Sequence, residues 1–138
     1  MKHQLTSTLI AALMLSATLF VTRAVAADSV KGMPPSIVAT VPQAGDTAVD
    51  PSLKEIRVTF SKDMKTERMW SFCQISKETF PTTSGQIRYV DNRTCVLPVT
   101  LEPGKTYVIW CNRAQYNSFR DTLNNPAVPY LLVFETRK

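Results

Sequence analysis

Histidine is almost absent from this sequence: His3 is the single one, and it lies in an N-terminal segment that we expect to be removed. The rest of the chain therefore lacks the commonest general base and the usual partner of a nucleophilic serine or cysteine. The four glycines are dispersed, so a glycine-rich phosphate loop is missing too. The carboxylate pairs Asp46/Asp50 and Asp63/Glu67 stand in turn-forming or polar segments, where solvation and capping account for them. These absences predict a non-catalytic protein without a cofactor.

Runs of like charge are missing as well. The chain has 16 lysines and arginines against 11 acidic residues, but the basic residues are scattered along it. A nucleic-acid-binding surface normally shows a basic patch or stripe. We therefore expect no nucleic-acid partner, and we interpret the excess of positive charge as a solvated surface.

The longest apolar stretch is short and lies at the start of the chain, over residues 9–21. It follows the basic Lys2, is closed by Arg23, and is shorter than the roughly 20 apolar residues that a membrane helix needs. A small–x–small sequence ends at Ala26, as at a signal-peptidase site. We expect residues 1–26 to be a signal peptide, with export to the periplasm or the exterior and no membrane span after cleavage. A buried N-terminal helix or an uncleaved anchor is the alternative.

Residues 27–35 have no periodicity and end in two prolines, so we expect a short flexible leader. After it, the chain alternates short apolar segments with turn-forming ones. No long amphipathic helical pattern is present. Residues 36–138 are therefore predicted to form one all-β domain, an antiparallel β-sandwich of about seven strands, with a small barrel as the alternative. The expected strands cover residues 36–41, 55–61, 70–76, 86–89, 94–99, the segment from the Pro103–Gly104 turn to Cys111, and 130–136.

Two residues predict finer features of this sandwich. Tyr107 follows a Pro–Gly turn at the start of an inner strand, the position of the tyrosine corner of Greek-key sandwiches, so its hydroxyl should return to the connecting backbone. Pro98 has no amide hydrogen to donate, so its strand should lie at a sheet edge or turn the proline outward.

Five sequence blocks stand out along the chain: VPQAGDTAVDPSL at 41–53, IRVTFSKDM at 56–64, LEPGKTY at 101–107, FRDTLNN at 119–125 and FET at 134–136. These blocks resemble, in the same order, those of the bacterial Ig-like domains of the SbsA type (the Big_5 group). The resemblance spans nearly the whole chain after the leader. Asn124 replaces the family's usual glycine, and residues 70–89 carry no family signature. The resemblance implies an Ig-like sandwich that serves as a structural or recognition module, with an unidentified protein or cell-envelope component as its partner.

The opening blocks also resemble periplasmic copper-binding sandwiches of the CopC type, which would imply copper handling. Those proteins bind copper through histidines, some of them in methionine-rich stretches. Beyond His3, this chain offers Met33, Met64 and Met69, which are scattered and form no cluster of soft ligands. We therefore expect no metal site, and copper handling stays an alternative function.

A carbohydrate-binding module is a second alternative, because aromatic side chains can stack on sugars. The aromatic residues considered for this role are Trp70, Trp110, Tyr116, Phe119 and Tyr130. Such residues more often pack in a core or at its rim, so the solvent exposure of the two tryptophans would discriminate between the two functions.

The longest irregular segment covers residues 113–129, well above the usual connection of about 4–6 residues. We predict a recognition loop here, carried by residue types that are common at interface hot spots: Arg113, Tyr116, Phe119 and Arg120. In the alternative interpretation, Phe119 and Val128 fold down to close the end of the sandwich and Asp121 caps a turn. The functional interpretation places Tyr116 and Arg120 outward.

Three cysteines, Cys73, Cys95 and Cys111, leave at least one thiol unpaired if the protein is oxidised after export. None has the spacing of a zinc site. In Ig-like sandwiches the third and sixth strands are sheet neighbours, so the resemblance makes Cys73–Cys111 the candidate disulfide. Buried free thiols are the alternative, because a disulfide between adjacent strands is often strained.

Overall fold

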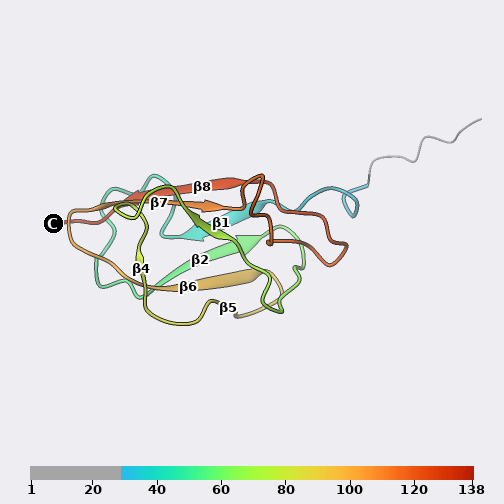
Figure 1. Ribbon diagram of the computed structural model, residues 1–138, viewed down its shortest axis with the longest axis horizontal. Coiled ribbons are helices and arrows are strands. Elements are labelled where there is room, and N and C mark those ends of the chain that lie inside the picture. The colour runs from blue at the N-terminus through green and yellow to red at the C-terminus, as the bar shows by residue number, and fades with distance from the viewer. Residues whose placement is uncertain (1–28) are drawn as a thin grey trace, which may run out of the picture.

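The alternation of apolar and polar residues in β2 (Glu55–Phe60) determines how the sandwich is built: Ile56, Val58 and Phe60 are buried while the residues between them face out. The computed structural model describes residues 29–138, in two antiparallel β-layers without a helix, and therefore without one that could cross a membrane (Figure 1). The predicted signal peptide, residues 1–26, lies outside the described residues. The sequence prediction of an all-β Ig-like sandwich is confirmed.

The larger sheet contains five strands. β1 (Ile37–Val41) pairs with β2, and β2 pairs with β6 (Thr94–Thr100). The far edge of β6 is shared by two short strands, β4 (Thr82–Thr83) and β5 (Arg88–Tyr89). The smaller sheet has the order β3–β7–β8, with β3 at Phe72–Gln74, β7 at Thr106–Cys111 and β8 at Tyr130–Glu135.

The core between the sheets consists of two adjoining clusters of buried side chains. One surrounds Ile56, Tyr107 and Phe134, and the other surrounds Phe60 and Phe119. Removal of apolar surface from water contributes about 25 cal/mol per Å², so these large side chains dominate the stabilisation of the sandwich. Phe72 of β3 is half-buried and packs against both clusters, which settles the ambiguous face of its strand.

The strand predictions need two corrections. The structure has eight strands, because the threonine-rich connection at 77–85 contains β4. The strand expected at 70–76 is reduced to β3, three residues long. Pro98 lies in an interior strand, so of the two expected arrangements the outward-facing proline is the one found: its neighbours Leu97 and Val99 face the core. Ser84 donates to the Pro98 carbonyl, and the missing amide hydrogen falls where the partner of β6 changes from β4 to β5.

The described part of the leader, residues 29–35, forms hydrogen bonds to the domain. Lys62 Nζ donates to the carbonyls of Lys31, at 2.8 Å, and Met33, at 2.6 Å. Pro35 is buried, and its carbonyl accepts from the amide of Val128. Residues 31–35 thereby follow the end of the sandwich that also carries the long loop.

The tyrosine corner forms as the sequence predicts. Tyr107 is buried, its ring lies 5.3 Å from that of Phe134, and the Glu102 amide donates to its hydroxyl oxygen at 2.7 Å. This bond fixes the turn before β7 onto the core. Thr136, the residue after β8, closes the same turn, because its hydroxyl donates to the Glu102 carbonyl at 2.6 Å.

We expect Tyr107→Phe to lower the free energy of unfolding by about 1–2 kcal/mol, because the Glu102 amide loses its acceptor while the apolar packing is kept. Urea unfolding followed by fluorescence measures the change. Tyr130→Phe is the matched control, since the Tyr130 hydroxyl makes no hydrogen bond within residues 29–138. Equal stability of the two variants would show that the corner bond contributes nothing.

Candidate functional site

The loop at residues 113–129 is organised by a residue that precedes it, Asn112. This side chain is fully buried, its Nδ2 donates to the carbonyls of Phe119 at 2.9 Å and Ala127 at 3.0 Å, and its Oδ1 accepts from the Phe119 amide at 3.0 Å. Its backbone is left-handed, with φ of 61°, a conformation that asparagine tolerates better than most residues. One side chain thus ties the ascending and descending arms of the loop to the end of β7.

Asp121 is the second anchor, and it caps a turn as the alternative interpretation expected. Its carboxylate accepts from the amides of Leu123 and Asn125 and from Lys62 Nζ at 2.7 Å. Burial raises the pKa of Asp121, but the hydrogen bonds of Lys62 and Asn125 and the charge of Lys62 outweigh this effect, so the pKa lies below its usual value. Asn124, which replaces the family's glycine, adopts φ of 72° in this turn, so it can take over the glycine's role.

The four residues of the predicted recognition loop separate into two groups. Phe119 is fully buried, with its ring 5.0 Å from Phe60 and 5.1 Å from Phe72, so it belongs to the core and offers no contact surface. Arg120 is half-buried, and its guanidinium bonds to Asn117 and to the carbonyl of Asn124 inside the loop.

The other two, Arg113 and Tyr116, face outward, and 61% of Tyr116 is exposed. The expectation that Val128 closes the end of the sandwich is wrong, because Ala127 is buried there and Val128 is exposed.

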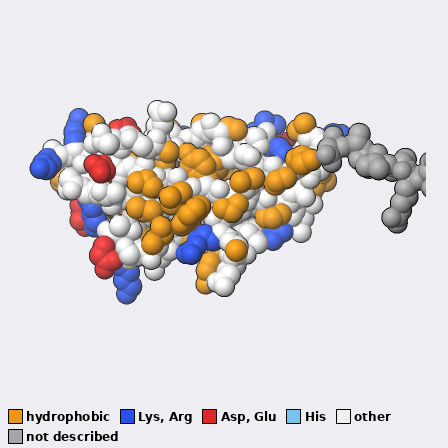
Figure 2. Space-filling model, turned by 90° about the horizontal axis from the view of Figure 1, so that it is seen from above, with side chains coloured by type: hydrophobic (Ala, Val, Ile, Leu, Met, Phe, Trp, Pro, Cys, Tyr) orange, Lys and Arg blue, Asp and Glu red, His pale blue; other side chains and the backbone are white. Residues whose placement is uncertain are grey.

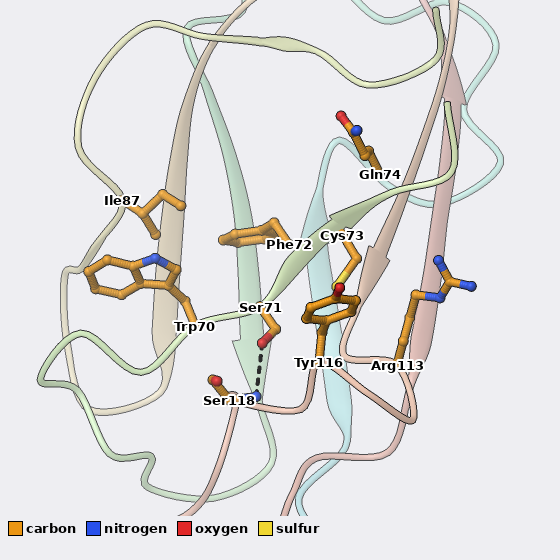
Figure 3. Close-up of a pocket in the computed structure, with 9 residues that line it drawn as sticks. All are labelled: Trp70, Ser71, Phe72, Cys73, Gln74, Ile87, Arg113, Tyr116 and Ser118. Carbon is orange, nitrogen blue, oxygen red and sulfur yellow. Dashed lines mark hydrogen bonds between the residues drawn. The ribbon is translucent and has the colours of Figure 1, made fainter. Parts of the chain in front are cut away.

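Arg113 and Tyr116 line a groove of about 660 Å³ that wraps around the edge strand β3 (Figure 3). On one side of the strand the groove meets Phe72, Trp70 and Ile87; on the other it meets Cys73 and the loop. A hydrogen bond from the Ser118 amide to Ser71 Oγ, at 2.8 Å, holds the loop against the strand. The lining residues are Trp70, Ser71, Phe72, Cys73, Gln74, Ile87, Arg113, Tyr116 and Ser118.

Beside the groove, the outer face of the three-stranded sheet is apolar. The register places Cys73, Trp110 and Leu131 in one row across the three strands, and Val108 opposite Val133 in the next row along. None of these five side chains is buried. Figure 2 views this side of the molecule and shows hydrophobic side chains gathered in a band along it. Exposed apolar patches of this kind mark interaction surfaces.

The electrostatics of the groove suit binding and not acid–base chemistry. Arg113 is the only charged residue of the lining, and it forms no ion pair with another described residue. Burial raises the pKa of the Cys73 thiol, which the Arg113 charge opposes in part, so the thiol is protonated and weakly nucleophilic at neutral pH. The groove therefore offers apolar contact and one cation.

The structure does not bring the candidate disulfide together. Cys73 lies opposite Trp110 in the β3–β7 ladder, so its side chain faces outward, whereas Cys111 faces the core. Cys73, Cys95 and Cys111 are all free thiols. Burial raises the pKa of Cys95 to about 12 and raises that of Cys111 as well.

Of the methionines considered for copper handling, Met64 is buried in the core and Met33 is exposed. Within residues 29–138 no three His, Cys, Asp or Glu side chains come together as metal ligands. Of the aromatic residues considered for sugar binding, Phe119 is in the core and Tyr130 packs against it, while Trp110 lies on the outer face and Trp70 lines the groove with Tyr116. They form no single stacking platform.

We expect only Cys73 to react with a maleimide in the folded protein, because the other two thiols are buried and have raised pKa values. The rate should increase as the pH is raised toward 9, since the thiolate is the reactive form. Mass spectrometry counts the labels, with three expected after denaturation without reductant. Fewer than three would reveal a disulfide, and rapid native labelling of Cys95 would contradict its burial.

Substitution of Asn112 should destabilise the protein in two separable ways. Asn112→Gly keeps the left-handed backbone but leaves the Phe119 and Ala127 groups without partners, at a cost of about 2–4 kcal/mol. Asn112→Ala should cost about 1 kcal/mol more, because alanine resists a positive φ. Urea titrations of the three proteins measure both effects, and an alanine variant more stable than the glycine variant would refute the strain argument.

Comparison with known proteins supplies a family. Residues 31–136 match the model of the bacterial Ig-like domain. The crystal structure of the S-layer protein rSbsC(31–844) is similar to 77% of this chain, at 19% identity and a TM-score of 0.47. The chain spans 14% of the length of that S-layer protein. No curated protein matches the chain.

Proposed function

The chain belongs to the bacterial Ig-like domain family, and from this premise we propose that it is an exported, non-catalytic module that binds another protein of the cell envelope. The observation that carries the proposal is the apolar outer face of the β3–β7–β8 sheet. A sandwich needs apolar residues only on the inner faces of its sheets, and β7 and β8 carry them on both. Val108, Trp110, Leu131 and Val133 lie outside both core clusters and remain at least partly exposed on the outer face.

Export and the absence of catalysis are parts of the same proposal. The features at the N-terminus that predict a signal peptide support export, to the periplasm or to the exterior. The groove beside the apolar face offers one arginine and one protonated thiol as its ionisable groups besides Tyr116, with no pair of groups set to act as acid and base. A surface of this composition is suited to protein contact.

The proposal is tested by binding to the envelope proteins of the source cell, with the mature protein as bait. Leu131→Ser/Val133→Ser removes apolar area from the outer face and should weaken retention of the specific partner about tenfold, the effect of truncating interface anchors. Val38→Ser/Val41→Ser makes the same kind of change on exposed residues of β1, in the other sheet, and should leave retention unchanged.

Melting temperatures check that both double variants stay folded. A retained protein that binds all three forms equally would overturn the proposal, and so would the absence of any retained protein.

A further inference from the structure

The strand β3 has a free edge with main-chain groups ready for pairing. The Asn112 amide donates to the Ser71 carbonyl at 3.0 Å, which makes this pair a hydrogen-bonded one. Such pairs alternate in an antiparallel ladder, so Cys73 bonds to Trp110, while the amides and carbonyls of Phe72 and Gln74 point away from β7. Within residues 29–138 these groups have no hydrogen-bond partner.

The outer edges of β8 and β1 differ from the edge of β3. The edge of β8 that faces away from β7 is covered by residues 45–49. The Gly45 amide donates to the Val133 carbonyl at 2.7 Å, and the Val49 amide donates to the Glu135 carbonyl. The edge strand β1 is interrupted by an irregularity between Ile37 and Ala39, the kind of bulge that blunts an edge. The edge of β3 has neither form of protection.

The groove has a suitable shape for an added strand, because it flanks the edge of β3 on both sides (Figure 3). Successive side chains of a strand point to opposite faces. A strand laid along β3 would therefore place one side chain toward Trp70, Phe72 and Ile87, and the next toward Cys73 and Tyr116. Both positions are apolar at their base.

The charge of the groove determines which charged side chain the added strand would carry. Arg113 is the lone charged residue of the lining and has no acidic neighbour to pair with in the described chain, so it favours a carboxylate. A second copy of this chain would bring its own Arg113 and its own excess of positive charge. Charge complementarity therefore selects an acidic partner over self-association.

We propose that the edge of β3 receives an extended segment of the partner protein, which extends the β3–β7–β8 sheet by one strand and places an acidic side chain against Arg113. This inference rests on the proposed function in that the partner is a protein, and it adds where and how that protein is bound. Strand addition is a known recognition mode in which main-chain bonds hold the segment and side-chain pockets select it.

The test uses an array of short peptides with alternating residues. One face is drawn from Val, Ile, Phe and Tyr, and the other from Thr, Asp, Glu and Lys. The mature protein should select peptides that contain Asp or Glu, and replacement of the acid by Lys should weaken binding about tenfold. Methylation of the peptide nitrogens along one edge should abolish binding, whereas methylation along the opposite edge should not, because only one edge pairs with β3.

Two readouts on the protein identify the site. Hydrogen exchange of the Phe72 and Gln74 amides should slow at least tenfold when the selected peptide is bound, and maleimide labelling of Cys73 should slow with it. Arg113→Glu should invert the preference from acidic to lysine-containing peptides. Lys54→Glu, the same charge change at an exposed residue outside the groove, should not.

Several outcomes would overturn the inference: no selected peptide, selection without acid enrichment, or binding that leaves the two β3 amides exchanging freely. Concentration-dependent dimerisation with protection of the same amides would replace the acidic partner by a second copy of the chain. If the peptide test fails while envelope binding still depends on Leu131 and Val133, only strand addition is refuted. The proposed function then stands.

Discussion

The buried side chain of Asn112 is the interaction on which the functional end of this domain depends. A loop of this length would be costly to order through contacts at its tip alone, since fixing each residue costs roughly 1–2 kcal/mol of backbone entropy. Asn112 reduces the problem by binding both arms of the loop at their base, through Phe119 and Ala127. Phe119 then packs between Phe60 and Phe72 and gives the loop its own part of the core. Arg113 and Tyr116 are held beside β3 as a consequence.

Much of the fold was predictable because its determinants are local. Regular alternation identifies β2, and a tyrosine placed just after a Pro–Gly turn identifies the corner bond to Glu102. Asn112 could not be identified in the same way, because a polar residue at the end of a strand usually marks exposure. Its burial depends on loop carbonyls that lie 7 and 15 residues away. One signal was present: asparagine is enriched at left-handed positions, and a strand that turns sharply into a loop needs such a position.

The site itself was less predictable, and the reason lies in β3. Three residues give no usable periodicity, so which of Phe72 and Cys73 faces the core follows only from the register with β7. The same register decides whether Cys73 and Cys111 can form a disulfide. Cys73 pairs with Trp110, one residue before Cys111, so the two cysteine side chains lie on opposite faces of the sheet. The apolar outer face was visible in the sequence as the Val108 and Trp110 side of β7. Its exposure depends on the absence of a third layer among residues 29–138, which no local pattern reports.

The short length of β3 also limits what its edge can contribute to recognition. The free amides and carbonyls of Phe72 and Gln74 can each gain about 0.5–1.5 kcal/mol by pairing, a few kcal/mol together. A dissociation constant of 1 mM already corresponds to about 4 kcal/mol, and ordering the bound segment adds a further cost. Main-chain pairing alone would therefore be weak, which protects the domain from indiscriminate aggregation through this edge. Tight binding requires the apolar groove, Arg113 and the adjoining outer face to contribute together, so a partner must match all three surfaces.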